Sequence, residues 1–192
     1  PKAQQSFDDA LAALERSEHE DALESFRLVQ ADYPDDPIAA LAELYAARAM
    51  LGDVDFSPQG KLQSSAAPEQ LELARRSFEA LGEGRRVDER VRFAARVYGA
   101  IALALQDRAE ESVRGLSDYP GASLGSVILA RDRPAAWMML CEAMWRASRH
   151  DEALIAAARL HDSVAQRLEA AGEEASEGDR RVARLIQLYA RG

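Results

Sequence analysis

The sequence of 192 residues contains three histidines and one cysteine, the residue types that most often bind transition metals or act as nucleophiles. His19 and His150 each precede acidic residues, and His161 follows eleven positions after His150. Two histidines that bind zinc from one helix lie four positions apart, and no pair here has that spacing. We therefore predict no metal site and interpret the histidines beside acids as polar groups in helix turns.

Motifs for nucleophilic catalysis and phosphate binding are also absent from the sequence. It has no G-x-S-x-G elbow and no glycine-rich loop ending in Lys-Ser or Lys-Thr. Cys141 stands in an apolar helical pattern, which predicts a buried packing residue. Gly82 and Gly84 follow no strand signal, so we interpret them as a turn between helices. We predict that the chain is not an enzyme and uses no cofactor; an enzyme is the least favoured alternative.

Charge and hydropathy limit the classes of partner. Charged residues make up 30% of the chain, and the net charge is −9. Duplex nucleic acid and anionic lipid both attract dense basic surfaces, so we expect no nucleic-acid partner. The most apolar stretch, residues 93–105, is shorter than the roughly 20 residues of a spanning helix and contains Arg96. The sequence therefore predicts no membrane span within this chain.

Helix-forming residues fill the segments between turn signals, and strand signals are nearly absent. Ala, Leu, Glu and Arg dominate these segments, which clusters of Gly, Pro, Asp and Ser separate. Asp36 and Pro37 are the favoured cap and first residue of the third helix. Nine helices are predicted, over residues 3–16, 19–32, 37–51, 68–81, 87–105, 108–117, 133–147, 150–170 and 179–190.

A pattern of bulky and small residues recurs along these helices. On paired antiparallel helices, small residues at fixed positions let the two backbones approach closely. The best match is Trp137, Leu140, Cys141 and Met144 on one helix with Ala153 on the next. Partial matches are Ile38, Leu41, Ala42 and Tyr45 in a first helix, Ala22, Phe26, Val29 and Pro34 in a second helix, and, after a slip of one residue, Phe7, Ala10, Leu11 and Leu14.

With these motifs the chain resembles the tetratricopeptide-repeat superfamily over nearly all of its length. The resemblance implies an all-α fold, a right-handed superhelix of about four degenerate helix pairs plus a C-terminal capping helix. It implies one domain over 1–192, with repeats near 3–34, 37–81, 87–120 and 133–170, an insertion at 53–67 and a capping helix at 179–190. The pattern weakens where Ala74 and Phe78 come late and where Ser112 and Leu116 replace an alanine and an aromatic residue. An unrelated bundle of Ala-rich helices is the alternative.

The resemblance also implies where a partner would bind, because first helices line the concave wall of such a superhelix. The positions carried over are Asp36, Ala39, Glu43, Ala46 and Ala47 in the second repeat, and Met138, Glu142, Trp145 and Arg146 in the fourth. Trp145 and Arg146 are the main candidates, since Trp and Arg most often anchor interfaces. Alternatively, Trp145 packs against a neighbouring helix or the insertion.

The wall of the third repeat is apolar instead. It consists of Ala94, Val97, Ile101, Ala104 and Leu105. Such a wall is either covered by another part of the protein or receives an apolar ligand. Repeats of this superfamily that clamp a chaperone carboxylate use Lys and Asn, and no first helix here contains either residue. We therefore exclude that function.

These features predict a non-catalytic scaffold whose partner is another protein or peptide. Segments such as 33–37 and 116–137 are also similar to bacterial envelope lipoproteins, including the helical N-terminal domain of penicillin-binding-protein activators. That similarity implies a periplasmic or outer-membrane-anchored location, a lipid anchor upstream and a longer protein of which this chain is an excerpt. The absence of Asn and Thr indicates a GC-rich bacterial genome. The alternative is a cytoplasmic regulatory or sensor module of a transcription or signalling protein.

Overall fold

The structure is a computed structural model that describes residues 2–114, 116, 124–125, 127–172 and 176–189. It is mostly helical, with 74% of residues in helices and 3% in strands, as the sequence predicts. The bounds of its helices are α1 Lys2–Glu15, α2 His19–Asp32, α3 Ile38–Ala49, α4 Pro68–Glu83, α5 Glu89–Leu105, α6 Ala109–Arg114, α7 Arg133–Arg146, α8 His150–Ala171 and α9 Glu177–Tyr189. A short 3₁₀ helix covers Ala130–Asp132.

The predicted helix positions agree closely with these bounds. Helices α2 and α8 begin at His19 and His150, where the turn signals place them. The Asp36 carboxylate accepts a hydrogen bond of 2.9 Å from the backbone N–H of Ile38, the first residue of α3. Asp36 therefore caps this helix, as predicted. Residues 119 and 120, expected to close the third repeat, lie outside the described residues.

The chain divides into two compact units. Unit 1 contains residues 1–53 and 65–102, and unit 2 contains residues 54–64 and 103–192. Each unit has its own set of packed elements. The expected stacking of all the helix pairs in one superhelix therefore stays a prediction.

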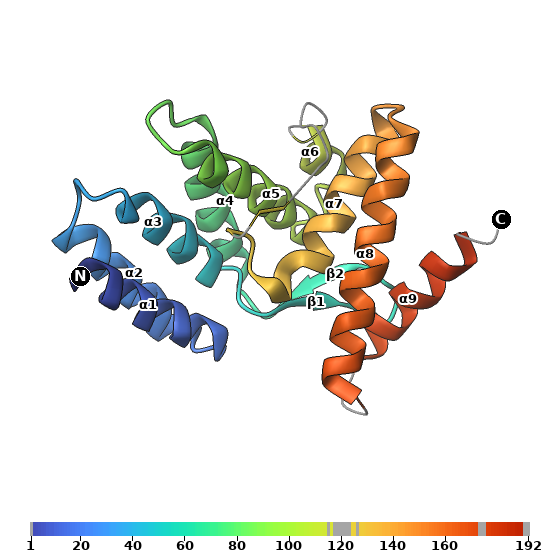
Figure 1. The fold of residues 1–192 in the computed structure, drawn as a ribbon, viewed down its shortest axis with the longest axis horizontal. Helices are drawn as coiled ribbons and strands as arrows, with labels where there is room; N and C mark the ends of the chain where they lie inside the picture. The colour runs from blue at the N-terminus through green and yellow to red at the C-terminus, as the bar shows by residue number, and fades with distance from the viewer. Residues whose placement is uncertain (1, 115, 117–123, 126, 173–175, 190–192) are drawn as a thin grey trace. The chain divides into compact units, whose positions relative to one another are not determined.

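In unit 1, α1 and α2 form an antiparallel hairpin, α3 packs on α2, and α4 packs on α3 (Figure 1). One aromatic side chain from each of the first three helices meets at the centre. The ring centroids of Phe7, Phe26 and Tyr45 lie 5.6–5.8 Å apart in tilted pairs. Aromatic rings favour such tilted contacts, so this cluster fixes how α3 covers the first hairpin.

The apolar wall on α5 is covered by the protein. Ala94, Val97 and Ile101 are fully buried, and Tyr98 stacks on Phe78 of α4 with ring centroids 5.6 Å apart. Of the two alternatives for this wall, the structure supports coverage at these three positions. An apolar ligand has no access to them.

One type of tight turn between helices occurs three times among the described residues. Its central residue has a left-handed backbone, with φ of 63° at Ser17, 58° at Asp107 and 60° at Ser148. In each turn, this residue donates its N–H to the carbonyl three positions earlier, and the next residue donates to the carbonyl five positions earlier, at 2.9–3.1 Å. This is the Schellman pattern that ends helices. A buried small residue follows five positions later, at Ala22, Ser112 and Ala153.

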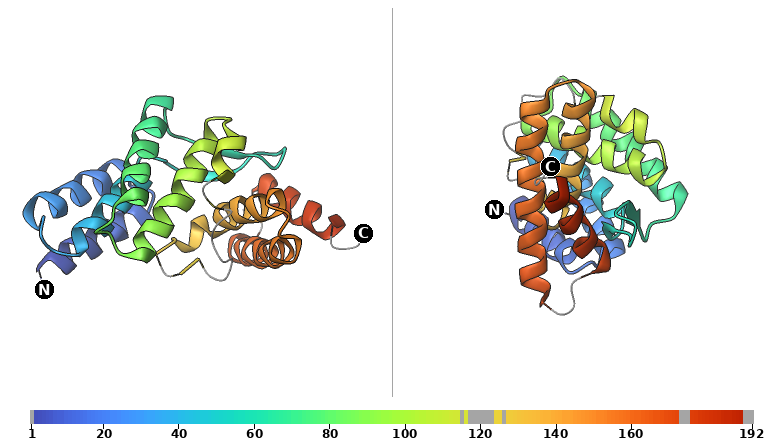
Figure 2. Two further views of the ribbon diagram at one scale, coloured as in Figure 1. Left: turned by 90° about the horizontal axis from the view of Figure 1, so that it is seen from above. Right: turned by 90° about the vertical axis from the view of Figure 1, so that its right-hand side faces the viewer.

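In unit 2, α7 and α8 form a second hairpin, α6 packs on α7, and α9 packs on α8 (Figure 2). The predicted insertion contains a small antiparallel sheet, which the sequence analysis missed. Strands β1, Val54–Phe56, and β2, Leu62–Ser64, pair with Val54 opposite Ser64. Strand β1 packs against α9. The insertion therefore contributes a structural element to unit 2.

The strands are held to α8 and α9 by charge and close contact. Arg167 Nη2 lies 2.7 Å from Asp55 Oδ1 and 2.9 Å from Asp179 Oδ2. Burial raises the pKa of Asp179, and the nearby charge of Arg167 opposes that rise. A Cβ atom at Gly178 would lie 1.8 Å from the backbone oxygen of Phe56, so only glycine permits this approach.

Candidate functional site

The six predicted partner-binding side chains fall into two groups. Asp36 and Glu43 belong to unit 1, whereas Met138, Glu142, Trp145 and Arg146 lie on α7 in unit 2. The second group contains both main candidates and is the more exposed.

Trp145 faces away from the core of the hairpin, as the sequence pattern predicts. Its exposed fraction is 57%, whereas Trp137, Leu140 and Met144 on the same helix are buried. The indole ring meets the imidazole of His150 edge to face, with centroids 4.8 Å apart. The contact fixes one edge of Trp145 while more than half of the side chain stays accessible.

Arg146 and Glu142 form an ion pair on the exposed face of α7. Arg146 Nε lies 2.6 Å from Glu142 Oε1, and both side chains are nearly half exposed. Pairs of this type at i and i+4 stabilise a helix by only about 0.3–0.5 kcal/mol. The pair can therefore reorient toward a partner at little cost. Met138 is half-buried and offers less surface.

Three further exposed apolar residues lie on α8 beside His150. Leu154 and Ile155 are 64% and 53% exposed, and Ala158 is exposed one turn later. Leu154 follows His150 by four positions, so the two lie on one face of the helix. We define the α8 patch as Trp145, His150, Leu154, Ile155 and Ala158.

The sequence carried a signal for this patch that the repeat pattern obscured. Residues 153–160 contain a single charged residue, Arg159, so the segment is apolar around its whole circumference. A helix that is apolar all round is normally covered on every side. The repeat pattern assigns second helices to internal packing and makes no prediction about their outer faces.

The group on α3 is less suited to a partner. The Asp36 carboxylate is occupied in capping α3, and Asp36 lines a cavity of about 330 Å³ with residues of α1 and α3. Glu43 is half-buried, and burial raises its pKa. Ala46 and Ala47 are buried, which corrects their expected place on a binding wall.

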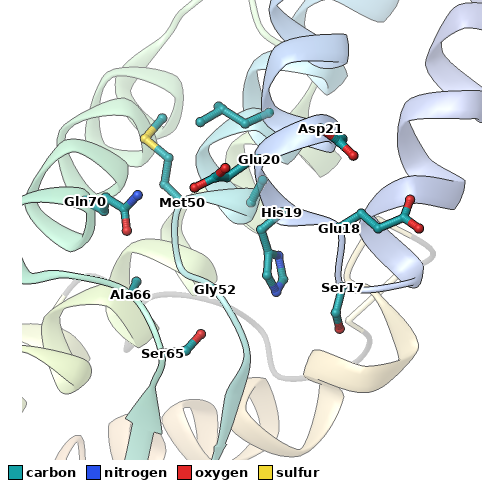
Figure 3. Close-up of a pocket in the computed structure, with 12 residues that line it drawn as sticks. Ser17, Glu18, His19, Glu20, Asp21, Met50, Gly52, Ser65, Ala66 and Gln70 are labelled. Atoms are coloured by element: carbon teal, nitrogen blue, oxygen red, sulfur yellow. The ribbon is translucent and has the colours of Figure 1, made fainter.

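A cavity of about 400 Å³ lies in unit 1 near the turn between α1 and α2 (Figure 3). Ser17 and His19 lie there beside Asp53, the residue types of a hydrolase triad. Ser17 Oγ and His19 Nε2 both lie 2.9 Å from the same oxygen, Asp53 Oδ1. A catalytic serine instead donates to the imidazole, which the carboxylate holds from its other nitrogen. These hydrogen bonds therefore have a structural role: they link the turn between α1 and α2 to Asp53, which follows α3.

Cys141 is half-buried, whereas the sequence predicts full burial. Its Sγ lies 3.5 Å from the carbonyl oxygen of Ala153, so it does pack between α7 and α8. Burial and the charge of Glu142 raise the pKa of the thiol. Both effects disfavour the reactive thiolate.

The described residues also bear on metal binding and on membrane insertion. No group of three or more His, Cys, Asp or Glu side chains there could hold a metal ion. No helix in the same part of the chain is long and apolar enough to cross a membrane.

Known proteins provide no match for this chain. No protein-family model, no curated protein and no solved structure matches it.

Proposed function

We propose that this protein is a non-catalytic interaction scaffold that binds another protein through the α8 patch and the adjoining end of α7. The observation that carries the proposal is the exposure of Trp145, Leu154 and Ile155 together on one hairpin. Among the described residues, the other large exposed apolar side chains are Leu28 and Leu73, which lie singly on α2 and α4. Grouped apolar residues mark interaction sites, whereas scattered ones are ordinary.

The residue types also suit an interface. Tryptophan is among the residues that contribute most to binding when a partner covers them. Fully burying a leucine or isoleucine contributes about 1.5–3 kcal/mol, and each of these residues is already partly covered. Leu154 and Ile155 would then supply roughly half of that each, and Trp145 would supply more.

The wider architecture belongs to the same proposal. The three Schellman turns, each followed by a buried small residue, support helix pairs of the tetratricopeptide type. On this reading the pairs stack as a right-handed superhelix, with α9 as the capping helix. Small-angle X-ray scattering of the protein tests the stacking, since an extended superhelix has a larger radius of gyration than a compact bundle of equal length.

Location in the periplasm or at the outer membrane is a further part of the proposal. Its support is the similarity of short sequence segments to envelope lipoproteins. A fusion of the intact gene product to alkaline phosphatase, which is active only after export, provides the test. Activity would support the envelope, and inactivity with full expression would favour the cytoplasmic alternative.

Site-specific photocrosslinking tests the interaction itself. A photoreactive phenylalanine analogue replaces Leu154 in one variant and Leu73, an exposed leucine on α4, in the control. We expect a crosslinked protein from position 154 that is missing from position 73 and weakened by Trp145→Ala. Identical products from both positions would contradict the proposal. Far-UV circular dichroism verifies that each variant is folded.

A further inference from the structure

The outer face of α8 is apolar where the equivalent face of α2 is charged, since Ile155 and Ala158 stand where α2 has Glu24 and Arg27. In unit 1, α3 packs along α2 and brings Tyr45 against Phe26. In unit 2, α9 lies along the C-terminal half of α8, where Asp179 meets Arg167 (Figure 1). Leu154 and Ile155 lie in the N-terminal half and stay exposed. An apolar helix face of this kind requires an occupant.

Charges beside the patch are arranged symmetrically about Ile155. Asp151 precedes it by four positions and Arg159 follows it by four, so all three lie near one line along α8. Both charged side chains are exposed, and neither forms an ion pair within the described part of the chain. Opposite charges at equal distances from a central residue make a surface complementary to itself.

We propose that a second copy of this chain occupies the α8 patch, with the two α8 helices antiparallel about a two-fold axis at Ile155. Asp151 of each copy then lies opposite Arg159 of the other, and the two Ile155 side chains meet at the axis. Such isologous contacts form closed dimers, in which each contact occurs twice. This inference rests on the proposed interaction function and names the partner.

Size and local charge both suit this occupant. Ala158 is small enough to let two helix axes approach to the usual 8–10 Å. Leu154 enlarges the apolar contact on one side of the axis. The neighbouring charges are already neutralised within each chain, by Arg146 with Glu142 and by Arg149 with Glu152. These local pairs limit the repulsion at this surface between two chains that each carry a net charge of −9.

Charge exchange across the axis provides the test. The full chain is measured by sedimentation equilibrium from micromolar to hundreds of micromolar concentration. We expect a monomer–dimer equilibrium that Asp151→Arg and Arg159→Asp each weaken by about tenfold or more, because like charges then face each other. The double variant should restore dimerisation, since exchanged charges are again complementary. Ile155→Glu should abolish the dimer.

A matched control comes from unit 1. Glu20 lies three residues after the turn residue Ser17, as Asp151 does after Ser148, so Glu20→Arg makes the same change on α2. It should leave the dimer unchanged. Far-UV circular dichroism identifies any variant that fails to fold.

The outcomes separate this inference from the proposed function. A wild-type chain that stays monomeric over the whole range overturns the self-association, as does a double variant that remains as weak as the single variants. The interaction function survives a monomeric result if photocrosslinking from position 154 still captures a different protein specifically. If that crosslink is also absent, both proposals fail.

Discussion

The hairpins α1–α2 and α7–α8 contain the same type of turn between their helices but differ on their outer faces. Ser17 and Ser148 hold the same left-handed conformation, and Ala22 and Ala153 fill the same buried position five residues later. At equal distances from the turn, α2 places Glu24 and Arg27 in solvent, whereas α8 places Ile155 and Ala158 there. The turn and inner face thus encode the hairpin, and the outer face encodes whether anything covers it.

The largest effect tests the covered hairpin. Phe26→Ala removes the central ring of the aromatic cluster in unit 1 and should lower the free energy of unfolding by about 3–5 kcal/mol. The equivalent position on α8 is Ala157, which is half-buried, so Ala157→Gly should cost only about 1 kcal/mol, mainly through helix propensity. Urea denaturation followed by circular dichroism measures both. Equal losses would show that the two hairpins are packed alike.

The second-largest effect concerns α9, which packs against the C-terminal half of α8. Arg167→Ala leaves Asp179 buried without its cation and should destabilise unit 2 by about 2–4 kcal/mol. Amide hydrogen exchange should quicken across 54–64 as the strands separate from α9. Arg184→Ala, which removes an exposed arginine of α9, is the control and should change neither quantity. Unchanged protection of the strands in Arg167→Ala would contradict the proposed role of the ion pairs.

A smaller effect on stability tests whether the turns at Ser17 and Ser148 are equivalent. Glycine adopts the left-handed conformation without the penalty of a side chain, so Ser148→Gly should stabilise the protein by about 0.5–1 kcal/mol. The gain at Ser17→Gly should be smaller, because Ser17 Oγ also donates to Asp53 at 2.9 Å. Thermal unfolding compares the two variants. A loss of stability in Ser148→Gly would show that this serine makes a contact of its own.

The smallest effect concerns the thiol of Cys141. Its raised pKa and partial burial predict slow labelling by a thiol reagent in the native protein and rapid labelling in denaturant. The equivalent residue of the first hairpin is Ala10, which is fully buried. Ala10→Cys in a Cys141→Ser background should therefore label more slowly still. Rapid native labelling of Cys141 would contradict its place between α7 and α8.

Much of the helical fold could be predicted from residue order alone. Turn residues and caps act locally, so the start of α2 at His19 and of α8 at His150 follow directly from sequence. The buried positions of Trp137, Leu140 and Met144 follow from helical spacing. The strands 54–56 and 62–64 could not be predicted, because their stability comes from Arg167 and Gly178, more than one hundred residues away.

The candidate site was predictable in part. Trp145 was identified because it lies opposite the buried face of its own helix, a property of local spacing. Leu154 and Ile155 were missed because their exposure depends on which helices pack against α8, and that is a tertiary fact. Ala46 and Ala47 were placed wrongly for the same reason, since their neighbours in unit 1 cover them.

The strands β1 and β2 are far in sequence from Arg167, which holds them to α8, and this separation has a consequence during synthesis. Asp55 leaves the ribosome 112 residues before Arg167, the cation that holds it. At about 5–20 residues per second, the strand segment waits roughly 6–22 s for its partner. Throughout that interval β1 and β2 are a lone pair of strands, which is marginally stable in water. The pairing of these strands therefore becomes secure only when synthesis of the C-terminal helices is complete.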